Sequence, residues 1–194
     1  MVKNPDSIPN AVLDANVLYP IHLRDFACWL QWQGAHRMFW SLELGTELRR
    51  ALNRASTDHQ LGDRVWRQLN QAFPDNLKDL HPKIPIGLPD ADDEHVAQLA
   101  SQYRCQLVTF NLRDFPADLI KPLVVRHPDD YFLEIVRNQP LRSIEAIRSM
   151  SMARNKIPVS QEQLIEALAQ NRLPRTAAQL NRLGGHYEQL VTGN

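Results

Sequence analysis

The sequence predicts an α/β protein in which helices flank a central parallel sheet and a small all-helical extension follows. Between residues 10 and 128, short apolar runs alternate with stretches of helical periodicity, which is typical of a parallel sheet covered by helices. After Pro128 only helical patterns remain. The 194 residues suffice for one ordinary domain and an appendage. We therefore predict a core domain at 10–128 and a helical C-terminal extension at 129–194.

The core domain is predicted to begin with a strand at 11–13, because Ala11, Val12 and Leu13 form a short apolar run that ends at a charged residue. Apolar residues recur every four positions over 58–80, which predicts a helix there. The remaining elements are a helix around 26–32 that gives way near Gly34, a strand at 38–40, a helix at 42–55 capped by Ser41, a helix with Val96 and Leu99 on its apolar face, and strands at 106–109 and 123–125.

The extension is predicted to contain four helices separated by prolines, at 129–138, roughly 143–155, 160–171 and 175–183. Ser160 and Gln163 fit a capping box at the start of the third helix. Gly184 and Gly185 are predicted to end the fourth helix, since glycine commonly follows the last helical residue.

The composition excludes several classes of protein. Hydrophobic residues make up 43% and charged residues 23%, as in ordinary globular domains. No apolar run approaches the roughly 18 residues that span a bilayer, and the N-terminus has no signal-peptide pattern, so we expect a cytoplasmic protein without a membrane segment. Cys28 and Cys105 form no C-x-x-C pair, and the histidines show no H-E-x-x-H spacing, which argues against a zinc site.

The charge is distributed unevenly along a chain whose formal net charge is zero. Residues 1–136 carry a net charge of −4, and residues 137–194 carry +4. A basic segment of this kind can hold nucleic-acid phosphates, or it can be the solvated face of helices that pack on the core domain or bind a partner. The sequence leaves both interpretations open.

Acidic and amide side chains gather where predicted strands end or helices begin. These residues are Asp14, Asn16, Asp90, Asp92, Asp93, Asn111 and Asp114. Ligand sites of parallel sheets form outside the carboxyl ends of the strands, and converging carboxylates suit Mg²⁺ or Mn²⁺. Most of these residues also have an ordinary explanation as turn formers or helix caps. Asp14 is the exception, because it interrupts an apolar stretch, where an unpaired carboxylate is costly.

Four segments of the core domain resemble the motifs of PIN-domain ribonucleases. They are LDANVLYP at 13–20, WSLELGTELRR at 40–50, LPDADDEHV at 88–96 and LVTFNLRDFP at 107–116. Their order and spacing are also similar. The likeness is greatest to VapC-type toxins of bacterial toxin–antitoxin pairs in which a small helical part follows the PIN domain. The second segment differs from the usual motif at Gly45 and Thr46.

The resemblance implies a Rossmann-like PIN domain in which four acids bind Mg²⁺ or Mn²⁺ and carry out catalysis. Carried over motif by motif, these acids are Asp14, Glu47, Asp93 and Asp114, and the polar support around them is Asn16, Thr109 and Asn111. Glu43 shares a helix face with Glu47, and Glu47 is preferred because it directly precedes LRR, as the family acid does. Asp93 is preferred to Asp92 because it precedes the helical residues that continue to Val96. His95 is expected to pack or hydrogen-bond near the site.

The resemblance further implies an endoribonuclease that hydrolyses RNA phosphodiesters with a metal-activated water and acts as the toxin of a toxin–antitoxin pair. Its partners would be RNA, a cognate antitoxin protein and a second copy in a homodimer. Two alternatives remain: a catalytically weak PIN-like module that binds RNA or regulates, and a metal-dependent DNA nuclease. The presence of an acid in every motif segment favours a nuclease over a binding module.

Overall fold

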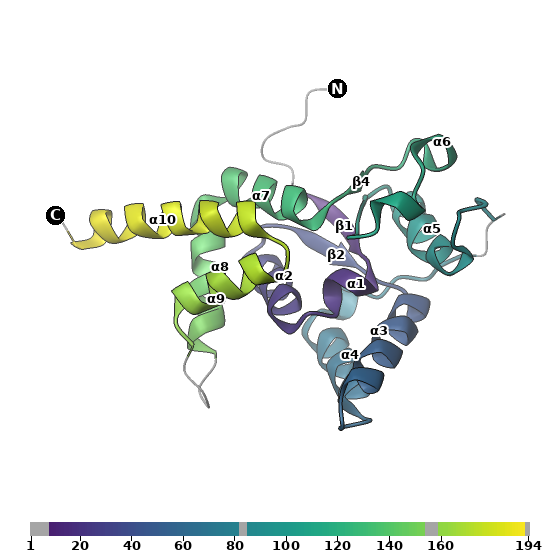
Figure 1. The fold of residues 1–194 in the computed structure, drawn as a ribbon, viewed down its shortest axis with the longest axis horizontal. Coiled ribbons are helices and arrows are strands. Elements are labelled where there is room, and N and C mark those ends of the chain that lie inside the picture. Colours follow the sequence, from purple (N-terminus) through teal and green to yellow (C-terminus); the bar gives the residue numbers. More distant parts are fainter. Residues whose placement is uncertain (1–7, 82–84, 154–158, 193–194) are drawn as a thin grey trace. The chain divides into compact units, whose positions relative to one another are not determined.

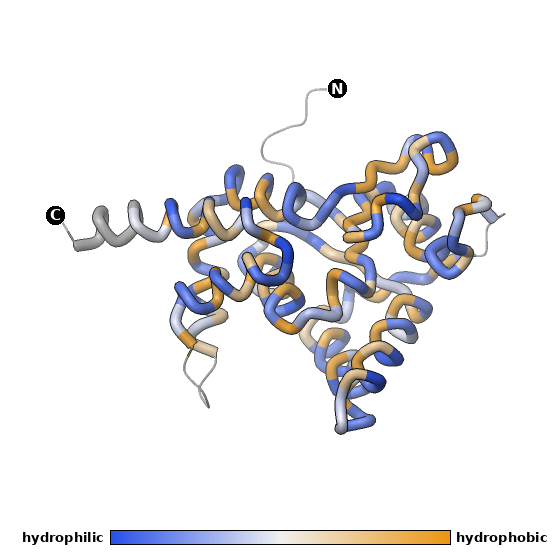
Figure 2. Tube along the Cα trace, viewed as in Figure 1, coloured by the Kyte–Doolittle hydropathy of each residue, from blue (hydrophilic) through white to orange (hydrophobic). Residues whose placement is uncertain are grey.

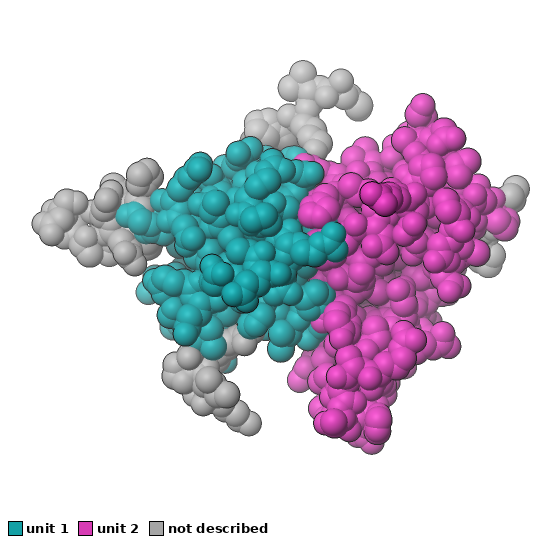
Figure 3. All heavy atoms as spheres, viewed as in Figure 1, with its two compact units in different colours: residues 1–8, 20–36, 128–194 teal, residues 9–19, 37–127 magenta. Residues whose placement is uncertain are grey.

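The computed structural model describes residues 8–81, 85–153 and 159–192 (Figure 1). The chain divides into two compact units, which Figure 3 draws in different colours. The sheet unit comprises Pro9–Tyr19 and Arg37–His127, and the helical unit comprises Pro20–His36 and the chain from Pro128 onward. The boundaries 10–128 and 129–194 stay a prediction. The contacts nevertheless group 20–36, which the sequence places in the core domain, with the C-terminal helices.

The sheet unit is built on four parallel strands in the order β2-β1-β3-β4, which confirms the predicted α/β class. The strands are β1 (Asn10–Leu13), β2 (Arg37–Phe39), β3 (Gln106–Val108) and β4 (Val125–Arg126). Val12 pairs with Phe39 on one side and with Leu107 on the other, so β1 is a central strand. Its apolar side chains are fully buried, as expected of a parallel strand covered on both faces.

Short helices and turns connect the strands of the sheet unit. They are α1 (Ala15–Leu18), α3 (Leu42–Ala55), α4 (Leu61–Ala72), α5 (Glu94–Gln102), α6 (Ala117–Ile120) and the 3₁₀ helices η1 (Pro74–Asn76), η2 (Ala91–Asp93) and η3 (Leu112–Asp114). The prediction of one helix over 58–80 is wrong at both ends. Pro74 has no backbone N–H and restricts Phe73 before it, so α4 ends at Ala72.

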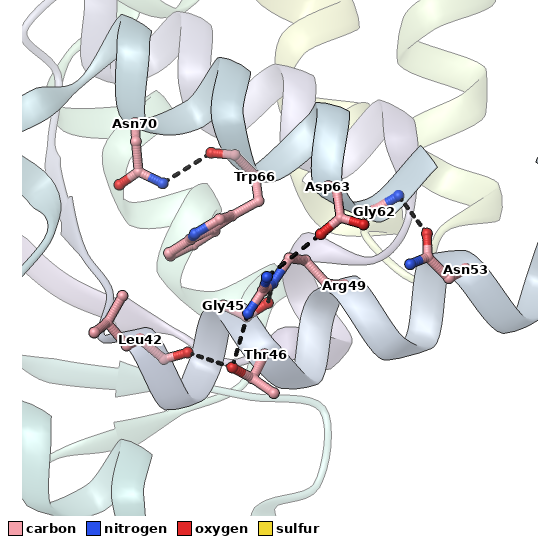
Figure 4. A network of polar contacts seen from close by, with 9 residues as sticks. All are labelled: Leu42, Gly45, Thr46, Arg49, Asn53, Gly62, Asp63, Trp66 and Asn70. Atoms are coloured by element: carbon pink, nitrogen blue, oxygen red, sulfur yellow. Dashed lines mark hydrogen bonds and ion pairs between the residues drawn. The ribbon is translucent and has the colours of Figure 1, made fainter. Parts of the chain in front are cut away.

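Two glycines allow α3 and α4 to approach closely in the α3–α4 hairpin (Figure 4). A Cβ atom on Gly45 would lie 2.4 Å from Cζ2 of Trp66, so the indole ring occupies the space that a side chain would need. A Cβ atom on Gly62 would lie 2.4 Å from the carbonyl oxygen of Arg49. Gly45, an unusual residue in the motif helix, therefore has a packing explanation in this chain.

Arg49 joins the same two helices through polar contacts (Figure 4). Its Nε donates to the carbonyl oxygen of Gly45 at 3.2 Å, and its guanidinium donates to Thr46 Oγ1 at 3.1 Å. The guanidinium also lies 3.3 Å from an Asp63 carboxylate oxygen on α4. Figure 2 shows hydrophobic and hydrophilic residues alternating along both helices, as amphipathic helices require. The hairpin thus holds α3 by packing on one face and leaves its other face exposed.

The helical unit contains α2 (Ile21–Trp32), α7 (Pro128–Asn138), α8 (Pro140–Met152), α9 (Gln161–Gln170) and α10 (Pro174–Thr192). Helix α2 joins this unit because its apolar residues, such as Phe26, bury against these helices: the rings of Phe26 and Phe132 lie 5.6 Å apart. The prediction that Gly184 and Gly185 end the last helix is wrong, since α10 continues to Thr192. Glycine costs about 1 kcal/mol in a helix interior but does not forbid it.

A buried aspartate links two helices of this unit. Asp129 on α7 accepts hydrogen bonds from the backbone N–H of Thr176 at 2.8 Å and of Arg175 at 3.1 Å, so it caps the start of α10. The Thr176 hydroxyl also donates to Asp129 Oδ1 at 2.8 Å. No helix within the described ranges is long and apolar enough to cross a membrane.

Candidate acidic site

The candidate site begins at the carboxyl ends of the two central strands. Asp14 directly follows β1, and Thr109 directly follows β3. Since the strands are parallel and adjacent, the two residues lie at the same edge of the sheet, where the Asp14 N–H donates to the Val108 carbonyl oxygen at 3.0 Å. Asp14 is only 2% exposed. The edge of the sheet therefore buries a carboxylate that must find polar partners.

Asp14, Asn16 and Thr109 form a closed polar triangle. The Thr109 hydroxyl and the Asn16 amide both donate to Asp14 Oδ2, each at 2.6 Å. The Asn16 amide also donates to Thr109 Oγ1 at 3.0 Å. The backbone N–H groups of Phe110 and Asn111 donate to Asn16 Oδ1 and Thr109 Oγ1 at 3.2 and 3.0 Å. These bonds fix the orientation of Asp14, whereas the Asn111 side chain is exposed.

Three further acids from separate elements act electrostatically on this edge. The pKa of Asp93 is raised to about 7, first by burial and then by the charges of Asp14, Asp90, Asp114 and Glu47 in that order. Burial also raises the pKa of Asp14, the Thr109 hydrogen bond opposes that rise, and Glu47 adds to it. Asp93 is thus within electrostatic range of the other three sequence-predicted acids, Asp14, Glu47 and Asp114, and Asp14 is within range of Glu47.

Glu43 and Asp92 are the neighbouring acids that the sequence offers in place of Glu47 and Asp93. Glu43, one turn before Glu47, is not among the charges that raise the pKa of Asp14 or Asp93. Asp92 is exposed, and its backbone N–H donates to the Asp90 side chain at 2.9 Å, so Asp90 serves as the cap of η2. These contributions favour Glu47 over Glu43 and Asp93 over Asp92 as neighbours of Asp14, and the choice of the four acids stays a prediction.

His95 on α5 contacts the glutamate of α3. Its Nε2 lies 3.4 Å from Glu47 Oε2, and its side chain is 19% exposed. Its Nδ1 is buried and has no hydrogen-bond partner within the described part of the chain. The contact with Glu47 joins α5 to α3 beside the acids, and the charge of His95 lowers the pKa of Asp14 slightly. The sequence signal for this contact was the position of His95 two residues after Asp93.

Glu94 is a residue whose role the sequence did not reveal. Its carboxylate accepts backbone hydrogen bonds from Ile86, Gly87 and Leu88 at 3.1, 2.7 and 3.3 Å. These bonds lower the pKa of Glu94, the Gly87 bond most strongly. They tie the segment before η2 to the first turn of α5. Asp93, at the junction of η2 and α5, is held in place by this anchor.

The donor chemistry of the site suits a hard divalent cation. Its side chains offer carboxylate oxygens, which Mg²⁺ and Mn²⁺ prefer. Burial is the main cause of the raised pKa values of Asp14 and Asp93, and the nearby like charges that add to it would be relieved by a cation. Within the described ranges, no three His, Cys, Asp or Glu side chains are already grouped closely enough to hold a metal ion. The residues therefore fit the ion by chemistry, and binding would require the four side chains to draw together.

Comparison with known proteins finds likeness in two ways. Residues 128–182 match the family model of the VapC50 C-terminal domain. The chain is also 33% identical over 94 residues to a Mycobacterium tuberculosis protein named "Putative ribonuclease VapC50", a match that covers 47% of this chain and 55% of that protein. The chain thus spans about half the length of the curated relative it matches. No solved structure matches it. The chain is thus similar to VapC-type proteins over two parts of its length, its C-terminal helices and a 94-residue match to a protein named as a ribonuclease.

Proposed function

We propose that the chain is a Mg²⁺- or Mn²⁺-dependent endoribonuclease and the toxin of a toxin–antitoxin pair. The observation that carries this proposal is the set of four acids, after β1 and on α3, η2 and η3, in which the charges of the other three act on Asp93 near the carboxyl edge of a parallel sheet. The likeness to a protein named as a VapC ribonuclease supports the choice of RNA as substrate. A cognate antitoxin, a homodimer and a cytoplasmic location are part of the same proposal.

The chain's own residues would divide the work of phosphodiester hydrolysis. Asp14, Glu47, Asp93 and Asp114 would hold one or two divalent ions, and a bound ion makes water a stronger acid and neutralises phosphate charge. Thr109 and Asn16 hold the Asp14 carboxylate in one orientation, and His95 holds Glu47 from the side of α5. Attack of water on phosphorus would break the bond to the 3′ oxygen, leaving a 3′-hydroxyl and a 5′-phosphate.

A substrate panel tests this function. The purified chain is incubated with single-stranded RNA and with single- and double-stranded DNA of the same sequence, in Mg²⁺, in Mn²⁺ and in EDTA. We expect cleavage of RNA only when a divalent ion is present, with 5′-phosphate ends on the products. Cleavage of DNA in preference to RNA would favour the DNA nuclease, and RNA binding without cleavage in either ion would favour the regulatory module.

A further inference from the structure

The exposed face of α3 carries the candidate acid Glu47 and two arginines in one stripe. Glu43, Glu47, Arg50 and Arg54 follow one another at spacings of four, three and four residues. At about 100° per residue, the four positions fall within an arc of about 60°. The opposite face is apolar and buried, through Leu44, Leu48 and Leu52. The stripe is therefore acidic at the start of α3 and basic toward its end.

Arg50 and Arg54 form no hydrogen bond or ion pair with any residue that the structure describes, and both side chains are exposed. Other arginines of the α3–α4 hairpin are used within the chain. Arg49 binds Thr46 and Asp63, and Arg64 pairs with Asp58. The two charges on the stripe are thus available to a ligand, whereas those of Arg49 and Arg64 serve the fold.

The position of the two arginines relative to Glu47 suits a chain of phosphates. Arg50 lies about one helical turn beyond Glu47, and Arg54 about two turns beyond it, at 1.5 Å of rise per residue. The helix between them is held against α4 by the close approaches at Gly45 and Gly62. The guanidinium group matches a phosphate with two parallel hydrogen bonds. A polyanion whose cleaved bond lies at the acids would therefore pass the arginines on its way along α3.

The acids themselves create a need for such a contact. Uncompensated carboxylates repel a polyanion, and a bound divalent ion compensates them only at the cleaved phosphate. We propose that Arg50 and Arg54 form a phosphate subsite that holds the RNA backbone next to the cleaved bond. The subsite rests on the proposed function, because the role of Glu47 comes from it. It reads no bases, so it contributes equally to all RNA sequences.

Fluorescence anisotropy tests the subsite with 12-nucleotide oligo(U) and oligo(A) RNA probes over a range of salt concentrations. All proteins carry Asp14→Asn, so that the probes are not cleaved during the titration. The test variant is Arg50→Gln with Arg54→Gln. The matched control is Arg64→Gln with Arg67→Gln, which removes two exposed arginines from α4 of the same hairpin.

We expect the test variant to raise the Kd roughly tenfold for both probes. The slope of log K against log salt should become shallower by about 1.4, because each lost phosphate contact contributes about 0.7. The control is expected to match the parent. When Arg50→Gln and Arg54→Gln are made in the protein that retains Asp14, they should raise KM for RNA cleavage more than they lower kcat.

Two different failures can be distinguished. If the protein that retains Asp14 cleaves RNA while the test variant keeps the Kd and salt slope of its Asp14→Asn parent, the subsite is wrong and the proposed function stands. A loss confined to one probe, or an equal loss in the control, also overturns the subsite. If the protein that retains Asp14 does not cleave RNA and the Asp14→Asn parent does not bind it, the proposed function fails, and the subsite fails with it.

Discussion

At the scale of single residues, Asp14 is a buried carboxylate that lowers the stability of the folded protein. Its carboxylate is buried at the end of β1, where burial and the charge of Glu47 both favour the protonated form. Two hydrogen bonds from Thr109 and Asn16 oppose that cost without removing it. A side chain selected only for stability would not be charged at this position, which is a reason to assign it a function.

Asp14→Asn is expected to stabilise the metal-free protein at neutral pH and to abolish cleavage. The folded protein holds the Asp14 proton more tightly than the unfolded chain does, so the associated stability is fully present below the unfolded pKa of 3.8 and is lost as the pH rises through the folded value. Asn stays neutral throughout. Urea unfolding in EDTA should therefore show a gain over the parent that grows from pH 4 to pH 8, with cleavage reduced at least about a hundredfold. A gain that does not change with pH would contradict this account.

Glu47→Gln is expected to weaken Mn²⁺ binding and RNA cleavage far more than Glu43→Gln does. Both glutamates lie on the exposed stripe of α3, but only the charge of Glu47 acts on Asp14 and Asp93. The two variants change the same group on the same helix, so each controls for the other. Calorimetric titration with Mn²⁺ measures the difference. An equal or reversed ranking would move the second acid to Glu43.

His95 is expected to act as a positioning residue for Glu47. Its Nε2 is the atom that faces the Glu47 carboxylate at 3.4 Å. Gln places an amide nitrogen close to where His places Nε2, so His95→Gln should retain most of the cleavage rate, whereas His95→Ala should reduce it about tenfold. A positioning role lowers kcat while leaving the unfolding midpoint of His95→Gln and His95→Ala similar. Equal loss of rate in both variants would show that the ring itself, rather than its Nε2 donor, is required.

At the scale of elements, the α3–α4 hairpin determines where the stripe of charged residues lies. Trp66 and the backbone at Arg49 fill the space beside Gly45 and Gly62, so the two helices cannot separate or slide without losing these contacts. The hydrogen bond from the Gly62 N–H to Asn53 Oδ1 at 2.7 Å adds a polar contact at the same crossing. The departure from the motif at Gly45 is therefore compensated by packing within this chain.

Gly62→Ala is expected to destabilise the protein by about 1–3 kcal/mol, because its Cβ would lie 2.4 Å from a backbone oxygen that can move only with the helix. Gly184→Ala on α10 is the matched control. Nothing lies within 4 Å of its added Cβ, so the higher helix propensity of Ala should stabilise the protein by about 0.5–1 kcal/mol. Chemical denaturation of both variants measures the two signs. A stabilising Gly62→Ala would refute the close approach of α3 and α4.

At the scale of the whole molecule, the stability of the helical unit depends on a buried neutral histidine. His36 is fully buried, with Nε2 2.8 Å from the carbonyl oxygen of Ala27 and Nδ1 3.0 Å from the Tyr131 hydroxyl. Burial lowers the pKa of His36 to about 4, and the Ala27 hydrogen bond opposes that shift. The folded protein therefore disfavours the charged form of His36, whereas the unfolded chain does not.

Acid is expected to weaken the folded state through His36. Between pH 6.5 and 4 the unfolded chain binds a proton that the folded chain does not, so the stability present above pH 6.5 is lost as the pH falls. The loss amounts to about 3 kcal/mol at 1.36 kcal/mol per pKa unit. The free energy of unfolding of His36→Gln should fall less over this range than that of the parent. Parallel pH profiles for the two proteins would contradict the assignment.

The basic character of the C-terminal segment is less available to a ligand than its net charge of +4 indicates. Arg154 and Lys156 lie outside the described residues, Arg175 pairs with Asp130, and Arg142 donates to the Gly34 carbonyl oxygen at 2.6 Å. An RNA role for the extension stays a prediction. Arg50 and Arg54, which are exposed on α3 in the same unit as the acids, give a better supported place for phosphate contact.

The sequence by itself determined the features that depend on near neighbours along the chain. The apolar run at 11–13 is a buried central strand, and Ser160 and Gln163 form the predicted capping box, because strand burial patterns and helix caps are local interactions. The acids of the candidate site could likewise be listed from their positions after strands and before helices. Identifying these acids did not require knowing which residues contact one another in the folded protein.

Only the tertiary structure decided which residues meet. Glu43 and Glu47 have the same local pattern, and the approach of α5 with His95 is what separates them. Gly45 reads as a weak helix residue until Trp66 occupies the space beside it, and α2 reads as part of the core domain until Phe26 packs on Phe132. These outcomes depend on contacts between residues far apart in the sequence, whose packing energies exceed the small local preferences that a sequence pattern records.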